Sequence, residues 1–509
     1  MRAENNKIKS EDRSCEMNSI SNRRDFIKAA GFAVASLALP GCGGTSKLSQ
    51  SDAGAKKPNI IFIMADDMGY GDLGCYNKNS KIPTPNMDAL AAGGIRFTDA
   101  HSPSAVCTPT RYGVITGRYC WRSRLKRGVL NGYSPALIDT QRMTVASLLK
   151  GQGYATACIG KWHLGLGSDK RTDFSKTLVP GPNDLGFDYF YGIPASLDMT
   201  PYCYVENDRA VDEPTLTIEA GKSNEDGWWR KGAIAPGFKH VEVLPNLTKK
   251  AVDYIGGHAI KSPDKPFFMY FPLPAPHCPI APADFVRGRS GAGGYGDYVV
   301  EVDWTVGQVV KALQRNGLAE NTLIIVTSDN GSPGRTKIDR AHSSVVEHYG
   351  HNPSGNLRGI KADVWDGGHR EPFVACWPGK IPAGRVCSEI CGTIDLLPTF
   401  ARLAGAEMPA DRVIDGRDIR PLMEGRPGAA SPHGAYFYYR GRNLEAVRSG
   451  KWKLRRVKKK TELYDLEADI SEKENLADRH PEIVKRLAGM MEEFDNELKA
   501  NSRPSGKSE

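Results

Sequence analysis

The run Ile60-Ile61-Phe62-Ile63-Met64-Ala65 leads directly into Asp66-Asp67, and its pattern sets the architecture that we expect for this chain of 509 residues. Three further apolar runs likewise end close to polar residues; they lie at 154–159, 267–271 and 323–327. Continuous apolar runs without polar alternation are typical of strands buried on both faces, as in a parallel sheet that helices cover. The four runs therefore predict an α/β fold with a large, mostly parallel sheet.

Amphipathic stretches between these runs supply the flanking helices. They lie at 86–93, 144–151 and 298–317. The chain is longer than the roughly 250–300 residues at which single cores stop growing, so we expect a second, smaller domain. We place a catalytic α/β domain at 58–405, after a linker at 43–57.

The character of the chain changes near residues 398–403. Short alternating segments then predict a small antiparallel sheet; they lie at 435–439, 444–448, 452–456 and 462–466. An amphipathic stretch at 482–498 predicts a helix packed on this sheet, and 499–509 reads as a frayed tail. We therefore expect a C-terminal α+β subdomain at 406–498.

The formal net charge of +9 suits an anionic partner, and both sulfated polysaccharide and nucleic acid satisfy it. The basic run 451–460, KWKLRRVKKK, is the obvious positive patch. No zinc-finger spacing or RNA-binding motif accompanies it, so we expect no nucleic-acid partner. We interpret the run as the solvated face of a strand, with glycan contact as the alternative.

The first 42 residues resemble an export signal and are set aside from the fold. Asn22-Arg23-Arg24-Asp25-Phe26-Ile27-Lys28 is similar to a twin-arginine signal, and the apolar stretch at 29–39 is too short to span a bilayer. Leu39-Pro40-Gly41-Cys42 resembles a lipoprotein cleavage box, which makes Cys42 the expected lipid anchor. The alternative, an unprocessed cytoplasmic tail, leaves these features unexplained. We expect an exported bacterial protein, periplasmic or membrane-anchored, with the twin-arginine export machinery as a partner.

Polar residues follow two of the apolar runs at their carboxyl ends. Asp66 and Asp67 follow the first run, and Asp329 and Asn330 follow the run at 323–327. Ligands of open α/β sheets collect beyond the carboxyl ends of the strands, so we expect these four side chains to face one cleft. Three clustered carboxylates need a cation, and an all-oxygen donor set favours calcium or magnesium. Either pair alone could also serve as a helix cap or a turn.

Cys107 is the most informative single residue. It opens Cys107-Thr108-Pro109-Thr110-Arg111, and Thr116-Gly117-Arg118 follows at a fixed distance. This pattern resembles the signature of the type I sulfatases. The resemblance implies that a formylglycine-generating or maturation enzyme oxidises Cys107 to formylglycine, an aldehyde whose hydrate is the nucleophile. A lone cysteine would instead suggest a buried residue in a turn before a helix.

The resemblance extends over nearly the whole chain beyond the linker. Further stretches similar to sulfatase motifs lie at 58–72, 160–165, 276–279 and 359–368. Residues 186–188 and 192–198 resemble the arylsulfatase A group, and this match implies that Ser196 lies near the sulfate. The fold that the resemblance implies is that of the alkaline-phosphatase superfamily.

Carried onto this sequence, the resemblance also implies a set of roles. One Ca²⁺ is held by Asp66, Asp67, the modified Cys107, Asp329 and Asn330. The residues that act on the ester are Arg111, which supports the aldehyde hydrate, Lys161 and Lys361, which bind the sulfate, and His277, a proton donor. One hydroxyl of the hydrate attacks sulfur and displaces the alcohol. His163 then takes a proton from the second hydroxyl, which expels sulfate and restores the aldehyde.

Eleven cysteines are present, and eight remain when Cys15, Cys42 and Cys107 are set aside. An even number permits disulfides, whose connectivity cannot be read from sequence. Between Asn330 and Lys361 lies a stretch rich in His, Arg, Gly and Ser that includes His351. We interpret this stretch as a polar, mobile loop that reads the sugar or ring of the substrate.

Taken together, these patterns predict a calcium-dependent sulfatase that hydrolyses sulfate monoesters. Sulfated glycans are the expected substrates, and aryl sulfates could serve as artificial ones. One alternative is a phosphate or phosphonate ester hydrolase on the same scaffold, which the released anion would distinguish. Another is a catalytically silent lipoprotein that binds sulfated polymers through its basic surface, and its binding would persist after Cys107→Ala.

Overall fold

A computed structural model describes residues 56–223, 227–334 and 343–502. The expected export signal and Cys42 lie outside these ranges. Within them, no helix has both the length and the apolar character needed to cross a membrane.

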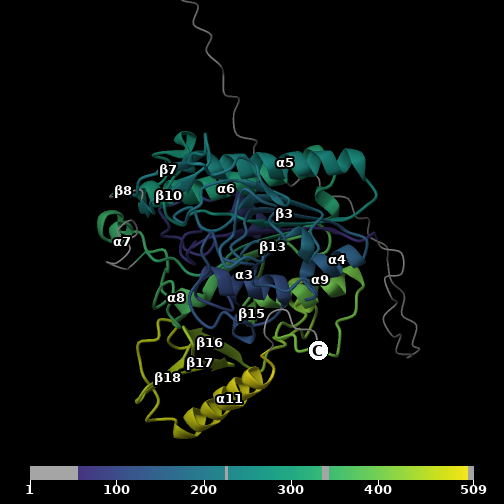
Figure 1. Ribbon diagram of the computed structural model, residues 1–509. Helices are drawn as coiled ribbons and strands as arrows, with labels where there is room; N and C mark the ends of the chain where they lie inside the picture. Colours follow the sequence, from purple (N-terminus) through teal and green to yellow (C-terminus); the bar gives the residue numbers. More distant parts are fainter. Residues whose placement is uncertain (1–55, 224–226, 335–342, 503–509) are drawn as a thin grey trace, which may run out of the picture. The chain divides into compact units, whose positions relative to one another are not determined.

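An 11-stranded sheet forms the centre of the larger part of the molecule (Figure 1). Its strands are β1 (Asn59–Ala65), β2 (Ile95–His101), β3 (Ala155–Lys161), β4 (Tyr189–Ile193), β5 (Val205–Glu206), β6 (Arg209–Ala210), β11 (Phe267–Pro272), β12 (Thr322–Ser328), β13 (Arg370–Cys376), β14 (Arg385–Cys387) and β15 (Cys391–Gly392). Their order is β14-β2-β13-β12-β1-β11-β3-β4-β5-β6, with β15 also paired to β2. The four apolar runs are the neighbours β12, β1, β11 and β3, all parallel. The predicted α/β fold with a mostly parallel sheet is therefore confirmed.

The register of the central strands brings their carboxyl ends level. Ala65 at the end of β1 lies opposite Ser328 at the end of β12, and Met64 lies opposite Pro272 of β11. All seven residues of β1 and of β12 are buried, because helices cover both faces of the sheet. The residues that follow Ala65 and Ser328 therefore emerge side by side.

Two groups of helices cover the sheet (Figure 1). The helices of this part are α2 (Pro85–Gly93), α3 (Cys107–Thr116), α4 (Val145–Gly151), α5 (Val243–Lys261), α6 (Gly293–Arg315), α7 (Ser343–Tyr349), α8 (Asp366–His369), α9 (Leu396–Ala404) and α10 (Arg420–Met423). In one group α6 packs against α5 and α2, and in the other α3, α4 and α9 pack together. Two further two-stranded antiparallel sheets pair β7 (Leu216–Ile218) with β10 (Gly232–Ile234) and β8 (Gly221–Ser223) with β9 (Gly227–Trp229).

The predicted small antiparallel sheet is also present. Its strands are β16 (Tyr436–Arg440), β17 (Asn443–Ser449), β18 (Trp452–Val457) and β19 (Lys460–Asp465), paired in sequence order. Helix α11 (Pro481–Ala500) packs on it, with the ring of Phe494 stacked on Phe437 at 3.8 Å between centroids. The domain bounds at 405 and 406 stay a prediction.

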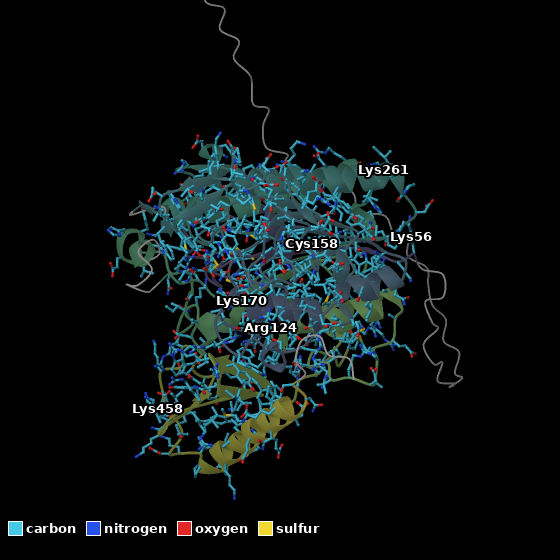
Figure 2. All side chains as sticks on the ribbon, in the orientation of Figure 1. Lys56, Arg124, Cys158, Lys170, Lys261 and Lys458 are labelled. Atoms are coloured by element: carbon cyan, nitrogen blue, oxygen red, sulfur yellow. The ribbon has the colours of Figure 1, made fainter. Side chains whose placement is uncertain are left out.

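One part of the basic run at 451–460 does not behave as expected. We predicted a solvated strand face, but the side chain of Lys453 is buried and its Nζ lies 2.6 Å from Asp366 and 2.9 Å from Glu472. Lys453 and its neighbour Leu454 point to opposite faces of β18 and both are buried, so both faces of the strand are covered at this point. Lys458, labelled in Figure 2, lies in the turn after β18 and is exposed. The ion pair with Asp366 joins the C-terminal sheet to α8.

No disulfide joins any of the nine cysteines in the part of the chain that the structure describes. Cys158, labelled in Figure 2, is buried in β3 and serves as an apolar core residue. The even number of cysteines that remained in the sequence was therefore no sign of a disulfide framework.

A buried carboxyl in α6 provides a stability prediction. Glu301 is fully buried, and burial raises its pKa to about 8 although Oε2 accepts a hydrogen bond from the backbone N–H of Ala283 at 2.9 Å. Between its unfolded pKa and about 8 the folded protein binds the extra proton, so this group's contribution to stability falls as pH rises through that window. We expect Glu301→Gln to gain stability relative to the parent between pH 5 and pH 9, as measured by urea midpoints. A stability difference that stays constant over this range would contradict the prediction.

Candidate active site

The two pairs of acidic and amide residues meet at the carboxyl ends of β1 and β12. The backbone N–H of Asp67 donates to Asp329 Oδ1 at 3.2 Å, and Asn330 Nδ2 donates to Asp67 Oδ1 at 2.6 Å. Asp66, Asp67, Asp329 and Asn330 are all buried. Asp67 adopts a left-handed φ of 67°, a conformation uncommon for a non-glycine residue and typical of functional sites. The predicted meeting of these four side chains is thus seen in the structure.

Cys107 begins α3 and points into this cluster. Its Sγ lies 3.4 Å from Asp66 Oδ1 and 3.8 Å from Lys361 Nζ. Burial and the nearby Asp66 carboxylate raise the pKa of the Cys107 thiol well above its ordinary value, although the two lysines oppose this. The thiol therefore stays protonated, and an unmodified Cys107 is a poor nucleophile.

Each carboxylate of the cluster has a basic partner. Lys161 Nζ lies 2.5 Å from Asp66, Lys361 Nζ lies 2.7 Å from Asp67, and Arg111 Nη2 lies 2.7 Å from Asp329. The three positive charges balance the three negative ones, which burial at low dielectric requires.

The pKa values of the two best-buried carboxylates are pulled in opposite directions. Burial favours the neutral acid at Asp66, but Lys161 and the other nearby basic groups outweigh it and hold the pKa of Asp66 well below its usual range. Burial and the Asp66 charge raise the pKa of Asp329 to about 6 in spite of Arg111. Asp66 is therefore the firmly ionised member of the pair.

The side chain of His163, just after β3, is set up to accept a proton. Its backbone N–H donates to Pro194 O at 3.0 Å, and its Nε2 lies 2.7 Å from Leu130 O, so Nε2 carries the hydrogen. Its Nδ1 is buried and makes no hydrogen bond to any described residue. Burial, helped by Lys161 and Arg111, holds the pKa of His163 well below its ordinary value. The imidazole is thus neutral, with a free lone pair on Nδ1.

His277 follows β11 and borders the same cluster. Its Nδ1 donates to Cys278 O at 2.7 Å, and its Nε2 lies 3.7 Å from Asp67 Oδ2. One ligand atom each from Asp66, Asp67, Cys107 and His277 lies within 4.8 Å of all the others. This side chain is therefore close to the same point as Cys107.

A hard cation fits the donors of this cluster. The Oδ1 atom of Asn330 is buried and accepts no hydrogen bond within the described chain. A buried polar oxygen without a partner is costly, and a cation would satisfy it together with the oxygens of Asp66, Asp67 and Asp329. The donor set is all oxygen, as calcium and magnesium prefer.

Ser196 lies at the margin of the site, on the turn after β4. Its Oγ is buried and makes no hydrogen bond to any residue that the structure describes. The turn reaches the cluster through Pro194, whose carbonyl accepts the N–H of His163. The structure thus brings together the carboxylate, amide, basic and histidine side chains that the sequence indicated, with Ser196 on a neighbouring turn.

Sequence reasoning missed two features of the site. Asp198, to which we gave no role, lies 3.9 Å from His277, and Arg230 pairs with it from far along the chain, so no local signal marks the pair. His351 was placed in a mobile polar loop, but it is buried and its Nε2 lies 2.8 Å from Asp72 Oδ1. Within the same stretch, Arg335, Arg340 and His342 lie outside the described residues.

Comparison with known proteins now decides the family. Residues 58–406 match the sulfatase family model, and residues 361–497 match the model of the N-sulphoglucosamine sulphohydrolase C-terminal region. The chain belongs to the sulfatase family. The predicted family and the predicted class of enzyme, a sulfuric ester hydrolase, are therefore confirmed.

Curated and solved relatives of this sulfatase cover most of its length. It is 33% identical to the N-acetylgalactosamine-6-O-sulfatase of Bacteroides thetaiotaomicron, over 89% of this chain and 97% of that protein. It is 38% identical to human arylsulfatase A, over 78% and 75% of the two chains. A solved structure from work on glycosaminoglycan metabolism by Bacteroides thetaiotaomicron superimposes with a TM-score of 0.78 at 32% identity, over 87% of this chain and 100% of the other.

Proposed function

We propose that this sulfatase hydrolyses sulfate monoesters of glycans, and that an N-acetylgalactosamine 6-sulfate is the first substrate to test. The observation that carries the proposal is the position of Cys107, whose Sγ lies between Asp66 and Lys361 in a closed, charge-balanced cluster. The choice of sugar rests on the bacterial relative, which is named for that ester and matches 89% of this chain.

We infer that Cys107 acts as formylglycine. Oxidation to the aldehyde would supply a hydrate with one hydroxyl to attack sulfur and a second hydroxyl to lose a proton. The protonated thiol at this position has no comparable reactivity. In this proposal the modifying enzyme acts in the cytoplasm, since twin-arginine export carries folded proteins. Unmodified Cys107 in the cytoplasmic precursor, with aldehyde only in the exported form, would contradict that order.

The surrounding residues have distinct tasks in the proposal. Nδ1 of His163, neutral and without a hydrogen-bond partner within the described chain, accepts the proton of the second hydroxyl. Lys161 and Lys361 supply positive charge to the sulfate oxygens. His277 protonates the leaving alcohol from Nε2, since its Nδ1 is held by Cys278 O. Arg111 forms an ion pair with Asp329 and holds that carboxylate in position near the aldehyde hydrate.

Ca²⁺ is the proposed metal, with Asp66, Asp67, Asp329, Asn330 and the modified Cys107 as its protein ligands. When bound, it would polarise the sulfate oxygens and offset charge on the ester. The basic partners of the carboxylates, Lys161 and Lys361, would then be free to turn toward the sulfate.

Removal of the metal gives a direct prediction. We expect excess EGTA to lower sulfate release by at least about 100-fold, because oxygen-rich sites hold Ca²⁺ reversibly and the clustered carboxylates lose their cation. Added CaCl₂ should restore the rate, and thermal unfolding in both states should show that the fold persists. Full activity after EGTA treatment and gel filtration would contradict the role of a dissociable calcium ion.

The test of the proposed function combines mass spectrometry and product analysis. Protein from its native host should yield a peptide across Cys107 with the mass of formylglycine, and should release inorganic sulfate from N-acetylgalactosamine 6-sulfate. Phosphate release from matched phosphate or phosphonate esters at a higher kcat/KM would favour the ester hydrolase alternative. An unmodified thiol in folded protein that binds sulfated polymers without turnover would favour the silent binder.

A further inference from the structure

One carboxylate beside the proposed active site, that of Asp198, has no role in the proposed reaction. Asp198 lies on the turn after β4, two residues beyond Ser196, and its side chain is only 4% exposed. Its Oδ1 accepts no hydrogen bond from any described residue. Buried carboxylate oxygens are normally hydrogen-bonded, so this one calls for an explanation.

The other oxygen of Asp198 is firmly held. Oδ2 forms an ion pair with Nη1 of Arg230, and the backbone N–H of Arg230 donates to Asp198 O at 3.1 Å. The Arg230 side chain is 45% exposed, and its guanidinium lies over the ring of Trp228, 4.5 Å from the ring centroid. Arg230 therefore fixes the orientation of the carboxylate and balances its charge, which leaves Oδ1 as a preoriented acceptor.

Asp198 does not serve mainly to orient His277. The two groups are 3.9 Å apart, which is too long for a hydrogen bond, and Nδ1 of His277 already donates to Cys278 O at 2.7 Å. A cation at this point is also disfavoured, because Arg230 already neutralises the carboxylate. Oδ1 of Asp198 therefore still lacks a hydrogen-bond donor among the described residues.

We propose that Asp198 is a specificity-determining residue whose Oδ1 accepts a hydrogen bond from a donor group on the sulfated sugar itself. The donor is a ring hydroxyl or amide N–H close to the ester, since His277 beside it is the proposed proton donor to the leaving oxygen. The inference rests on the proposed function and deepens it. A simple aryl sulfate carries no such donor, so Asp198 distinguishes sugar sulfates from aryl sulfates.

The first experiment compares two substrates in the full-length, matured enzyme. For Asp198→Ala we expect kcat/KM on N-acetylgalactosamine 6-sulfate to fall by about 10- to 100-fold more than kcat/KM on nitrophenyl sulfate, the range of a lost hydrogen bond to a charged group. Asp198→Asn keeps the shape and a neutral acceptor, so its loss should be smaller. Lys231→Met is the control: Lys231 is exposed and pairs with Glu219 at 2.7 Å, so both rates should stay unchanged. Equal losses on the two substrates would overturn the proposal and assign Asp198 a structural role.

A second experiment identifies the donor. Monodeoxy and de-N-acetylated analogues of the sugar sulfate are assayed with the parent and with Asp198→Ala. One analogue should be poor for the parent and should show no further loss in the variant, because the same hydrogen bond is missing in both. Variant losses that are equally large for every analogue would overturn the proposal.

The outcomes also separate this inference from the proposed function. A parent enzyme that hydrolyses nitrophenyl sulfate but no sulfated sugar would overturn the glycan function and this inference with it. A parent enzyme that hydrolyses sugar sulfates and loses both activities equally on Asp198→Ala would overturn only the inference.

Discussion

Replacement of Cys107 by alanine should abolish sulfate release while leaving the fold intact. We expect kcat to fall by at least about 10⁴-fold, since removal of a nucleophile that acts in concert with a base costs up to about 10⁶-fold. The variant also removes the precursor of formylglycine, so no other residue of the cluster can take over the attack. Cys107→Ser should be equally inactive, because a serine ester has no second hydroxyl from which His163 could take a proton.

The measurement is sulfate release by ion chromatography, together with thermal unfolding. Cys387→Ala is the matched control, because Cys387 is a free, half-buried cysteine in edge strand β14. The control should keep parental activity. Turnover by Cys107→Ala above one thousandth of the parental rate would refute the assignment of the nucleophile.

Replacement of Lys453 by methionine should lower the free energy of unfolding more than any other substitution proposed for this protein. Its ammonium is fully buried between the Asp366 and Glu472 carboxylates, at 2.6 and 2.9 Å. Burial raises the pKa of Glu472 to about 7 even with Lys453 present, which shows how poorly this environment tolerates an unpaired charge. Removing one partner of a buried ion pair costs about 3–5 kcal/mol, so we expect a loss of that size in the free energy of unfolding.

Two further variants make this prediction specific. Lys459→Met removes an exposed lysine from the turn after β18 and should change the unfolding free energy by less than about 0.5 kcal/mol. Adding Glu472→Gln to Lys453→Met should recover part of the lost unfolding free energy, because it removes a carboxylate that has lost its basic partner. Urea unfolding at pH 7 measures all three. An equal effect of Lys453→Met and Lys459→Met would contradict a buried ion network.

Local pattern was sufficient to predict much of the fold. The apolar runs became the neighbouring strands β12, β1, β11 and β3, because short uninterrupted apolar runs are typical of strands buried on both faces. Strand β13 was not foreseen. It carries Arg370, Glu371 and Pro372 at its start, and it pairs antiparallel with β12 and β2, a choice of partner that no local pattern encodes.

The same division holds for the site. Asp66, Asp67, Asp329 and Asn330 could be named in advance because each directly follows a central strand, and Cys107 because its motif is local. Asp198 and Arg230 could not be paired in advance, because Arg230 lies 32 residues further along, between β9 and β10, and reaches Asp198 only through the packing of the chain. Lys453 looked like one of many basic residues in a solvated run until the packed sheet turned it inward.

The amino-acid order alone therefore specified the strands, the polar residues at their ends and the candidate nucleophile, since periodicity and motif spacing are properties of neighbours in the chain. The folded structure settled which basic group faces which carboxylate: Lys361 meets Asp67 across 294 residues of sequence. It also set the protonation states, holding His163 neutral and the Cys107 thiol protonated. Burial and the distances between charges control those states, and both exist only after distant segments pack together.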